Sequence, residues 1–347
     1  MSTASVPRRK RFAWKRVVGI GVAVAAIVVT FVFVLPRIAD YGDVWAAVQD
    51  LTWAQIGLLT AATLLNLATY APPWQAALPG LGFRQAFVVT QASTASTYIA
   101  PGGAAVGMAV SYAMLRAWGF GVGRVALAVS VTGVWNQFAM LGFPVVALAL
   151  LTFVNEQNPL LITVAAIGLA VFVAAAAAFA AGLATPRVAR WIGDLAARVV
   201  NWVLRLVRRG PVKWSGESLV EFRNRALELL RRRWHVITLT TLAGQLTVFV
   251  LLLVALRVLG VSASEVSVIE AFAAWSTVRL LGSLPITPGG IGVVEVGLTG
   301  ALVGFGGDNA EVVAAVLIYR VLTIVPTLLL GLAAAFTWRR QRPQAVA

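Results

Sequence analysis

Long apolar stretches, separated by short polar segments, constrain this chain more than any other feature of its sequence. Hydrophobic residues make up 60% of it and charged residues 12%, against about 25% charged in an average soluble domain. A soluble core cannot bury so much apolar surface, whereas about twenty apolar residues span a bilayer as a helix. The sequence therefore predicts an all-α polytopic membrane protein, with residues 1–347 forming a single transmembrane domain. The apolar stretches occupy residues 17–35, 53–78, 85–118, 125–153, 160–183, 235–256, 266–305 and 312–337.

Two of these stretches are interrupted by the same tripeptide. Pro101-Gly102-Gly103 lies inside 85–118, and Pro288-Gly289-Gly290 lies inside 266–305. Proline and two glycines break a helix, and such backbone survives at membrane depth only inside protein or beside a cavity. Each stretch could therefore cross the membrane as a broken helix or return to its starting side as a re-entrant hairpin.

The distribution of positive charge decides between these two topologies. The basic cluster at residues 8–11 favours a cytoplasmic N-terminus, and residues 186–233 carry twelve Arg and Lys against four acids. Both segments lie on the cytoplasmic side only if 85–118 is re-entrant, since basic loops favour that side. A re-entrant 266–305 likewise places Arg339, Arg340 and Arg342 inside. Arg257 alone then falls on the unexpected side. We predict about six full transmembrane helices plus two re-entrant broken-helix hairpins in an inverted repeat, with both termini cytoplasmic.

The predicted domain has two halves, residues 17–183 and 235–338, joined by a basic connector at 186–233. Arginines recur in this connector every three or four residues between apolar ones, which is typical of an amphipathic helix at the cytoplasmic interface. An ordinary basic loop remains an equal alternative. A second short helix is expected over 217–233.

The two interrupted stretches also resemble each other. At an offset of 187 residues, eight of 24 positions are identical between 96–119 and 283–306. Paired segments interrupted by glycine and proline in the two halves of a membrane protein indicate a transport site. The alternative is that each tripeptide only forms a tight turn packed against other helices.

Helix physics suggests what such a site binds. The second half of a broken helix begins with free N–H groups and the positive end of its dipole, which attract anions. These starts fall at 102–105 and 289–292, where glycine lets a headgroup approach the backbone. The candidate substrate-binding residues around the breaks are Pro101, Gly102, Gly103, Pro288, Gly289, Gly290, Ser96, Thr97, Tyr98 and Thr287.

Three charged residues at membrane depth complete the candidate site. A charge at the centre of a membrane helix costs about 2.5–3.5 kcal/mol on insertion scales, so Arg279, Glu295 and Arg320 are functional candidates. Glu295 could pair with either arginine in a structural ion pair, and one arginine could remain free for a lipid phosphate.

Other classes of function find little support in the sequence. The chain has no cysteine and one histidine, and no phosphate-binding loop or catalytic constellation is evident. We therefore expect no enzyme activity, no cofactor and no metal. The net charge of +15 lies in segments that flank apolar spans, which argues against nucleic-acid binding.

The segment from Ser283 to Glu295, followed by Gly306 and Arg320, resembles the flippase-like family of the lysylphosphatidylglycerol synthase transmembrane region. The resemblance covers residues 15–340. It implies a membrane domain that moves a polar-headed lipid between leaflets, with Pro288–Gly290, Glu295 and Arg320 as motif residues. The first-half motif lacks the charged residues that follow the break in family members, and no aminoacyl-transferase domain is expected after Ala347.

These features predict a lipid translocase in the plasma membrane that moves a polar-headed, anionic or phosphate-bearing lipid between leaflets. A separate, lipid-modifying enzyme is the partner that could supply this lipid. The alternatives are a membrane-embedded enzyme or transferase subunit acting on lipid-linked substrates, and a structural partner protein. The sequence does not indicate the oligomeric state.

Overall fold

The computed structural model describes residues 41–100, 103–154, 159–185, 187, 216–283 and 287–338. The predicted span 17–35, residues 188–215 of the connector, Pro101 and Gly102 lie outside these ranges. The regular elements of the described ranges are all helical, as predicted. They are α2 (Tyr41–Gln49), α3 (Trp53–Thr69), α4 (Pro72–Ala77), α5 (Phe83–Ile99), α6 (Gly103–Ala117), α7 (Val122–Val154), α8 (Pro159–Ala184), α10 (Gly216–Val258), α11 (Val268–Gly282), η3 (Pro288–Gly290), α12 (Val293–Gly304) and α13 (Asn309–Thr337).

Within the described residues, five helices are long and apolar enough to cross a membrane. They correspond to five of the six predicted spans, and the sixth is the one outside the described residues. The protein is therefore a multi-pass membrane protein. The five helices lie within Trp53–Ala77, Val122–Thr152, Ala166–Ala184, Val220–Val258 and Asn309–Thr337.

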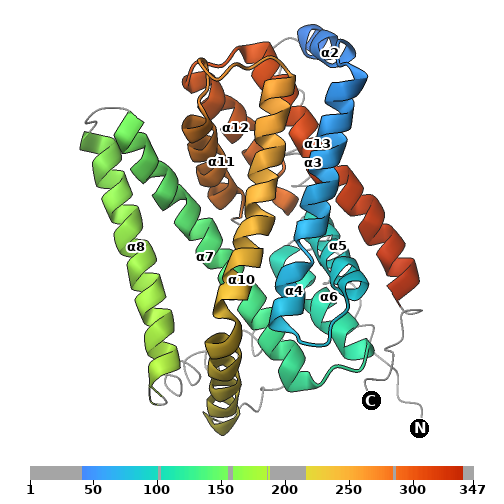
Figure 1. Cartoon of the computed structure of the whole chain (residues 1–347), viewed down its shortest axis with the longest axis vertical. Helices are drawn as coiled ribbons and strands as arrows, with labels where there is room; N and C mark the ends of the chain where they lie inside the picture. The colour runs from blue at the N-terminus through green and yellow to red at the C-terminus, as the bar shows by residue number, and fades with distance from the viewer. Residues whose placement is uncertain are drawn as a thin grey trace, which may run out of the picture.

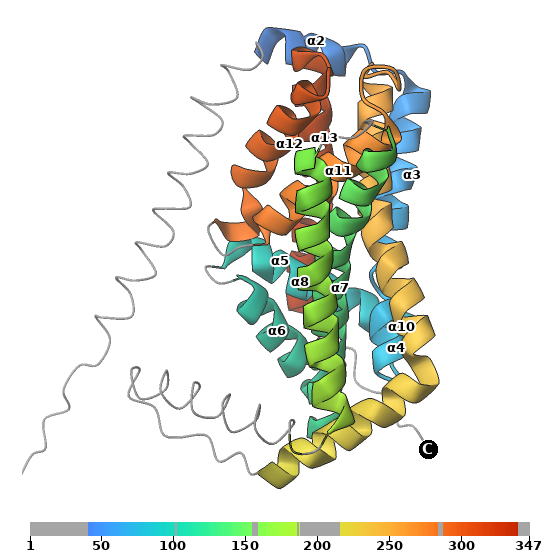
Figure 2. The same cartoon turned by 90° about the vertical axis from the view of Figure 1, so that its left-hand side faces the viewer.

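The prediction of a separate short helix over 217–233 is wrong. α10 runs without interruption from Gly216 to Val258. Its basic first part extends obliquely along one end of the molecule before the apolar part rises through it (Figure 2). No proline lies between these residues, and the sequence there consists largely of good helix formers, so nothing ends the helix before Gly260, whose φ is +102°.

The first interrupted stretch forms a tight antiparallel hairpin of α5 and α6. A Cβ atom built on Gly103 would lie 2.2 Å from the carbonyl oxygen of Thr97, and one on Gly107 would lie 2.9 Å from that of Ser93. The later residue of α6 thus contacts the earlier residue of α5, so the two helices run in opposite directions. Both lie in the lower half of the molecule in Figure 1.

The second interrupted stretch forms a hairpin of α11 and α12 in the upper half of Figure 1. A Cβ on Gly282 would lie 2.6 Å from Val294, and one on Gly297 would lie 3.0 Å from Val278, so this pair is also antiparallel. The turn at η3 contacts α5. The two hairpins thus enter from opposite ends and meet at their tips.

The remaining spans enclose the hairpins. α13 packs along α5, with Gly331 so close to Gln91 that a Cβ would lie 2.9 Å from its carbonyl oxygen. α7 packs along α11, with the Phe143 and Phe272 rings 5.7 Å apart. α3 and α10 pack on each other, while α8 lies against α7 on the outside (Figure 1).

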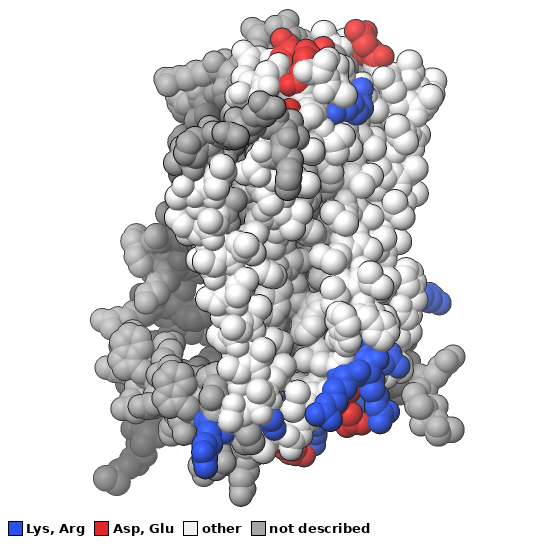
Figure 3. Space-filling view, turned by 60° about the vertical axis from the view of Figure 1, so that its left-hand side comes forward, with Lys and Arg blue, Asp and Glu red and all other residues white. Residues whose placement is uncertain are grey.

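Charged residues are concentrated at the two ends of the molecule. On the face in Figure 3, Asp and Glu gather at the end where α3, α11 and α13 begin, and most Lys and Arg gather at the other. The band between them is almost free of charge on this face. We call these the acidic end and the basic end.

Arg257, the basic residue at the acidic end, has a structural role. Its guanidinium donates hydrogen bonds to the carbonyl oxygens of Val261 (2.7 Å), Ser262 (2.9 Å) and Val266 (2.7 Å), in the loop before α11. These contacts satisfy backbone groups of a tight loop, which accounts for an arginine among the acidic residues at this end.

Candidate functional site

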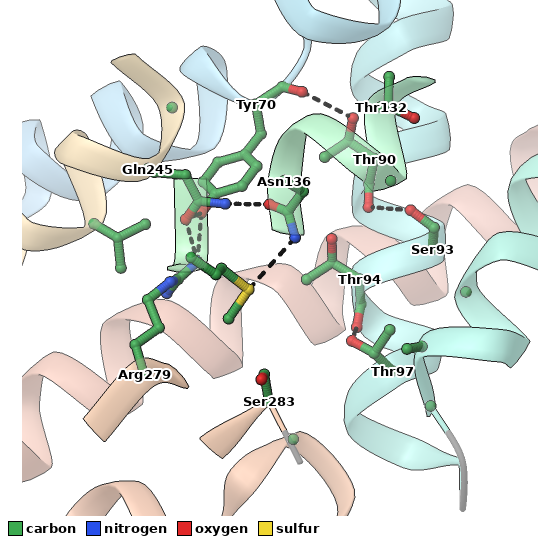
Figure 4. A pocket seen from close by; sticks show the side chains of 18 of the residues that line it. Tyr70, Thr90, Ser93, Thr94, Thr97, Thr132, Asn136, Gln245, Arg279 and Ser283 are labelled. Carbon is green, nitrogen blue, oxygen red and sulfur yellow. Dashed lines mark hydrogen bonds between the residues drawn. The ribbon is translucent and has the colours of Figure 1, made fainter. Parts of the chain in front are cut away.

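A cavity of about 1370 Å³ lies where the two hairpin tips meet. Residues of α3, α4, α5, α6, α7, α10, α11, η3, α12 and α13 contribute to its lining, so both halves of the chain build it. Most of the lining is apolar, with amides, hydroxyls and two arginines among it. Figure 4 shows Arg279 and Gln245 on one side of this space and Thr94 and Thr97 of α5 on the other.

One of the two arginines pairs with the buried carboxylate. Arg320 Nε donates to Glu295 Oε1 at 2.7 Å, with residue exposures of 8% and 1%. Arg320 Nη2 also donates to the carbonyl oxygen of Gly289 at 3.1 Å. This pair therefore fastens α13 to both α12 and the turn of the second hairpin, and it resolves which arginine partners Glu295.

The same carboxylate corrects the prediction of free amides at 289–292. Glu295 Oε2 accepts a hydrogen bond from the Gly292 N–H at 2.7 Å, and the Gly290 N–H donates to the Thr287 carbonyl oxygen at 3.2 Å. Two of the amides expected to meet a headgroup are thus used within the chain. The carboxylate at the third helical position reaches back to the cap residue, as in a capping box.

The start of α6, in the first hairpin, lies at the cavity. Gly103, Ala104 and Ala105 are its first residues, and all three line the cavity. The opening amides of a helix have no acceptor within that helix, and they carry the positive end of its dipole. A helix N-terminus therefore faces the cavity from this side.

Arg279, on α11, has neutral partners. Its Nη2 donates to the Tyr70 hydroxyl at 2.9 Å and to Gln245 Oε1 at 2.5 Å. Gln245 in turn donates through Nε2 to Asn136 Oδ1 (Figure 4). Residues from α11, α10 and α7, with Tyr70 at the C-terminal end of α3, thus form one polar chain that fixes the guanidinium.

An aromatic cluster supports this arginine from behind. The Arg279 guanidinium carbon lies 5.4 Å from the centre of the Trp275 ring, which is stacked on Phe272 at 5.8 Å. Phe143 and Phe249 pack on the same two rings. A cation over an aromatic face is stabilised by the ring quadrupole, most strongly where water is excluded.

The cavity brings together about half of the predicted site residues. Ser96 donates instead to the Ala92 carbonyl oxygen at 2.7 Å within its own helix. Gly290 is a buried residue of the turn η3, and Glu295 is buried against Arg320. Pro101 and Gly102 lie outside the described residues, and of Pro288 only the backbone, in η3, is described. The predicted residues that line the cavity are Thr97, Tyr98, Gly103, Arg279, Thr287, Gly289 and Arg320.

Gln245 is the main residue missing from the sequence-based site. It is 2% exposed and contacts Arg279, Tyr70 and Asn136. The available signal was an amide in the middle of the apolar stretch 235–256, because such a group needs partners at membrane depth. Its link to Arg279, 34 positions away, is a property of the fold.

Residues 17–331 match the family described as the lysylphosphatidylglycerol synthase TM region. The chain belongs to this family. The match includes both hairpins and the spans that enclose them, so the lysylphosphatidylglycerol synthase TM region is nearly coextensive with this chain. No curated protein matches the sequence.

Membership in the lysylphosphatidylglycerol synthase TM region family agrees with the resemblance carried by the second-half motif, from Ser283 to Glu295. The structure adds a physical reason for the motif. Its glycines form the turn that contacts Tyr98, and its Glu295 caps α12 and pairs with Arg320. In this family member, residues of the motif line one side of a cavity that also contains two arginines.

Proposed function

We propose that this protein is a lipid translocase, which carries the polar head of an anionic or phosphate-bearing lipid through the cavity between the hairpins. The observation that carries the proposal is a cationic cavity enclosed by two helix breaks inside the apolar part of the molecule. Drug-sized ligand sites measure about 300–1,000 Å³, and this cavity measures about 1370 Å³. It is large enough for a headgroup while acyl chains remain in the bilayer.

The charge of the cavity supports an anionic guest. Arg279 and Arg320 line it, and the one carboxylate that pairs with either of them among the described residues, Glu295, is bound to Arg320. The N-terminus of α6 adds a partial positive charge. A phosphate between these groups would exchange its hydration shell for fixed donors.

Matching helix ends support an inverted repeat. Just beyond the end of α6, the N–H groups of Gly119 and Phe120 bond to the carbonyls of Arg116 and Leu115 in the last turn of that helix. At the same offset of 187, Gly306 and Gly307 bond to Val303 and Leu302 after α12. Gly119 and Gly306 both have positive φ, at +90° and +116°. Gly260 ends α10 with a similar bond, so this kind of helix cap is not confined to the two hairpins. The support for an inverted repeat comes from the equal offset of 187 residues.

Helix packing has the same symmetry. The first hairpin packs on α13, the span that follows the second hairpin, and the second packs on α7, the span that follows the first. α3 and α10, which precede the hairpins, pack on each other. Inverted repeats around a central site are the architecture in which one half rocks against the other for alternating access.

The orientation that fits this proposal has the basic end in the cytoplasm of a cell expressing the protein in its plasma membrane. Both termini then face the cytoplasm, as basic segments favour that side. With a negative interior, moving one negative charge outward gains about 2.3 kcal/mol per 100 mV. An anionic lipid could therefore be exported without ATP, and a lipid-modifying enzyme could supply it from the inner leaflet.

Transport is a better account of the cavity than catalysis. A general acid or base must be free to exchange a proton with a substrate. Glu295 accepts from Arg320 with one oxygen and from Gly292 with the other, so both oxygens are occupied by the chain itself. The geometry favours a structural carboxylate.

The proposal is tested by lipid movement in proteoliposomes. The purified chain is reconstituted with fluorescent phosphatidylglycerol, and a membrane-impermeant reductant measures how much label reaches the outer leaflet. We expect label to move several-fold faster than in protein-free vesicles. If neither phosphatidylglycerol nor any other anionic lipid tested moves faster in vesicles with protein than in protein-free vesicles, translocation is refuted.

A further inference from the structure

The two arginines of the cavity have different roles, and this difference bears on the lipid headgroup. Resting on the proposed function, we propose that Arg279 is the anion-binding residue and that the cavity selects a headgroup with one negative charge and no ammonium group. Arg320, by contrast, holds the hairpin turn. A phosphodiester lipid whose headgroup bears only hydroxyls is the matching chemistry.

The charge of Arg320 is already neutralised inside the protein. It forms an ion pair with Glu295 and donates to the Gly289 carbonyl, and both side chains are buried. Drawing it toward a lipid would leave Glu295 as an uncompensated buried charge, which is strongly unfavourable. Arg320 is thus a poor candidate for a group that binds and releases a substrate.

Arg279 has no such partner. None of the ion pairs among the described residues includes it, and its contacts are the Tyr70 hydroxyl, the Gln245 amide and the Trp275 ring. Its Nε is buried and has no hydrogen-bond partner in the described part of the chain. A full positive charge with an unused donor therefore lines the cavity, where charge-assisted hydrogen bonds to phosphate are strong.

A second unused donor points to the same guest. The Thr287 hydroxyl, beside the second turn, is buried without a hydrogen-bond partner among the described residues, and Thr287 lines the cavity with Arg279. Buried polar groups normally have partners. An oxygen-rich headgroup that displaces the side chains covering these two atoms would satisfy both donors.

The balance of charges sets the number of negative charges on the guest. The described lining carries Arg279 and Arg320, and Glu295 cancels the second, which leaves one net positive charge. A single phosphodiester neutralises it. Since buried charges need compensation, one negative charge is the best match.

An ammonium group on the headgroup would have no anionic partner in the described cavity. Of the acids whose side chains the structure describes, only Glu295 is buried, and Arg320 and Gly292 occupy it. An aminoacylated or ethanolamine headgroup would then bury a cation without a counter-charge. We infer that such lipids bind more weakly than their hydroxyl-bearing counterparts.

The test measures binding directly, so that it does not depend on transport. The full chain in detergent is titrated with dioctanoyl phosphatidylglycerol, dioctanoyl phosphatidylethanolamine and short-chain lysylphosphatidylglycerol, and the shift in melting temperature gives each affinity. The variants are Arg279→Gln and Arg279→Lys. The control is Arg232→Gln, because Arg232 is an exposed arginine of α10, nine residues before Thr241, the first residue of that helix that lines the cavity.

We expect phosphatidylglycerol to bind about tenfold or more tightly than either amine-bearing lipid. Arg279→Gln should remove this preference, Arg279→Lys should keep part of it, and Arg232→Gln should leave it unchanged. If Arg279→Gln does not fold, the headgroup preference of the unmodified chain still decides. Equal binding of all three lipids, or unchanged selectivity in a folded Arg279→Gln, overturns the inference.

The outcome separates this inference from the proposed function. Selective binding with no translocation in proteoliposomes would refute transport and leave the Arg279 site standing. Translocation that ignores headgroup charge would leave transport standing and refute the selectivity.

Discussion

At the scale of single residues, the charged groups at the described part of the cavity are an ion pair and an arginine with neutral partners. Glu295 and Arg320 bond to each other, to a helix N-terminus and to a turn carbonyl. Arg279 has only neutral partners. The same residue types thus differ in role because of what the fold places beside them.

Replacing one member of the buried pair should destabilise the protein strongly. Glu295→Gln leaves Arg320 as an unpaired buried cation, and breaking a buried pair from one side costs about 3–5 kcal/mol. A lowered melting temperature in detergent would show this. The double variant Glu295→Gln/Arg320→Met should recover part of the loss, since both charges are then absent.

A second outcome would contradict the structural role of the pair. If Glu295→Gln melts at the temperature of the unmodified chain, then the carboxylate does not hold α12 to α13. In that case Glu295 would have to be regarded as part of the substrate site.

At the scale of elements, the two hairpins depend on close contact at their tips. Gly289 has φ +63°, and a Cβ there would lie 2.2 Å from Cδ1 of Tyr98 on the other hairpin. A left-handed backbone favours glycine, and no side chain fits between the turn and the ring. This one position therefore combines a conformational and a steric requirement.

Gly289→Ala should lower stability by more than about 1 kcal/mol, because alanine is unfavourable at positive φ and would meet Tyr98. Gly300→Ala is the matched control. Gly300 lies in α12 with nothing within 4 Å of a built Cβ, and alanine there should stabilise the helix by about 0.5–1 kcal/mol. If both substitutions shift the melting temperature in the same direction and by the same amount, the contact between Gly289 and Tyr98 at the hairpin tips does not contribute to stability.

The elements show what the sequence could and could not predict. Apolar length and the Pro-Gly-Gly breaks predict the five described spans and both hairpins, since bilayer thickness and helix breaking act locally. The partner of Glu295, the role of Gln245 and the occupied amides at Gly290 and Gly292 depend on contacts between distant segments. The sequence does not predict the continuous α10, because its change from basic to apolar residues resembles a helix boundary although the backbone stays helical.

At the scale of the whole molecule, charge separates to the two ends, and this predicts its orientation. The basic end should face the cytoplasm. Since the chain has no cysteine, single substitutions report each end: Ser264→Cys in the loop at the acidic end and Asn224→Cys near the start of α10. In intact cells a membrane-impermeant maleimide should label Ser264→Cys alone.

Labelling of Asn224→Cys in intact cells, with Ser264→Cys protected, would invert the topology. Permeabilised cells provide the control, because both cysteines should react once the membrane is open. Both sites are exposed in the structure.

The proposed function requires that the headgroup passes through the cavity between the hairpin tips. Thr97→Cys places the only thiol of the chain in that cavity, and Leu329→Cys places it on an exposed, apolar position of α13. Each is reacted to completion with a methanethiosulfonate reagent and assayed for phosphatidylglycerol movement in proteoliposomes. We expect labelled Thr97→Cys to move lipid at least about tenfold more slowly, with recovery after reduction, and labelled Leu329→Cys to be unaffected. Unchanged lipid movement in fully labelled Thr97→Cys would contradict the claim.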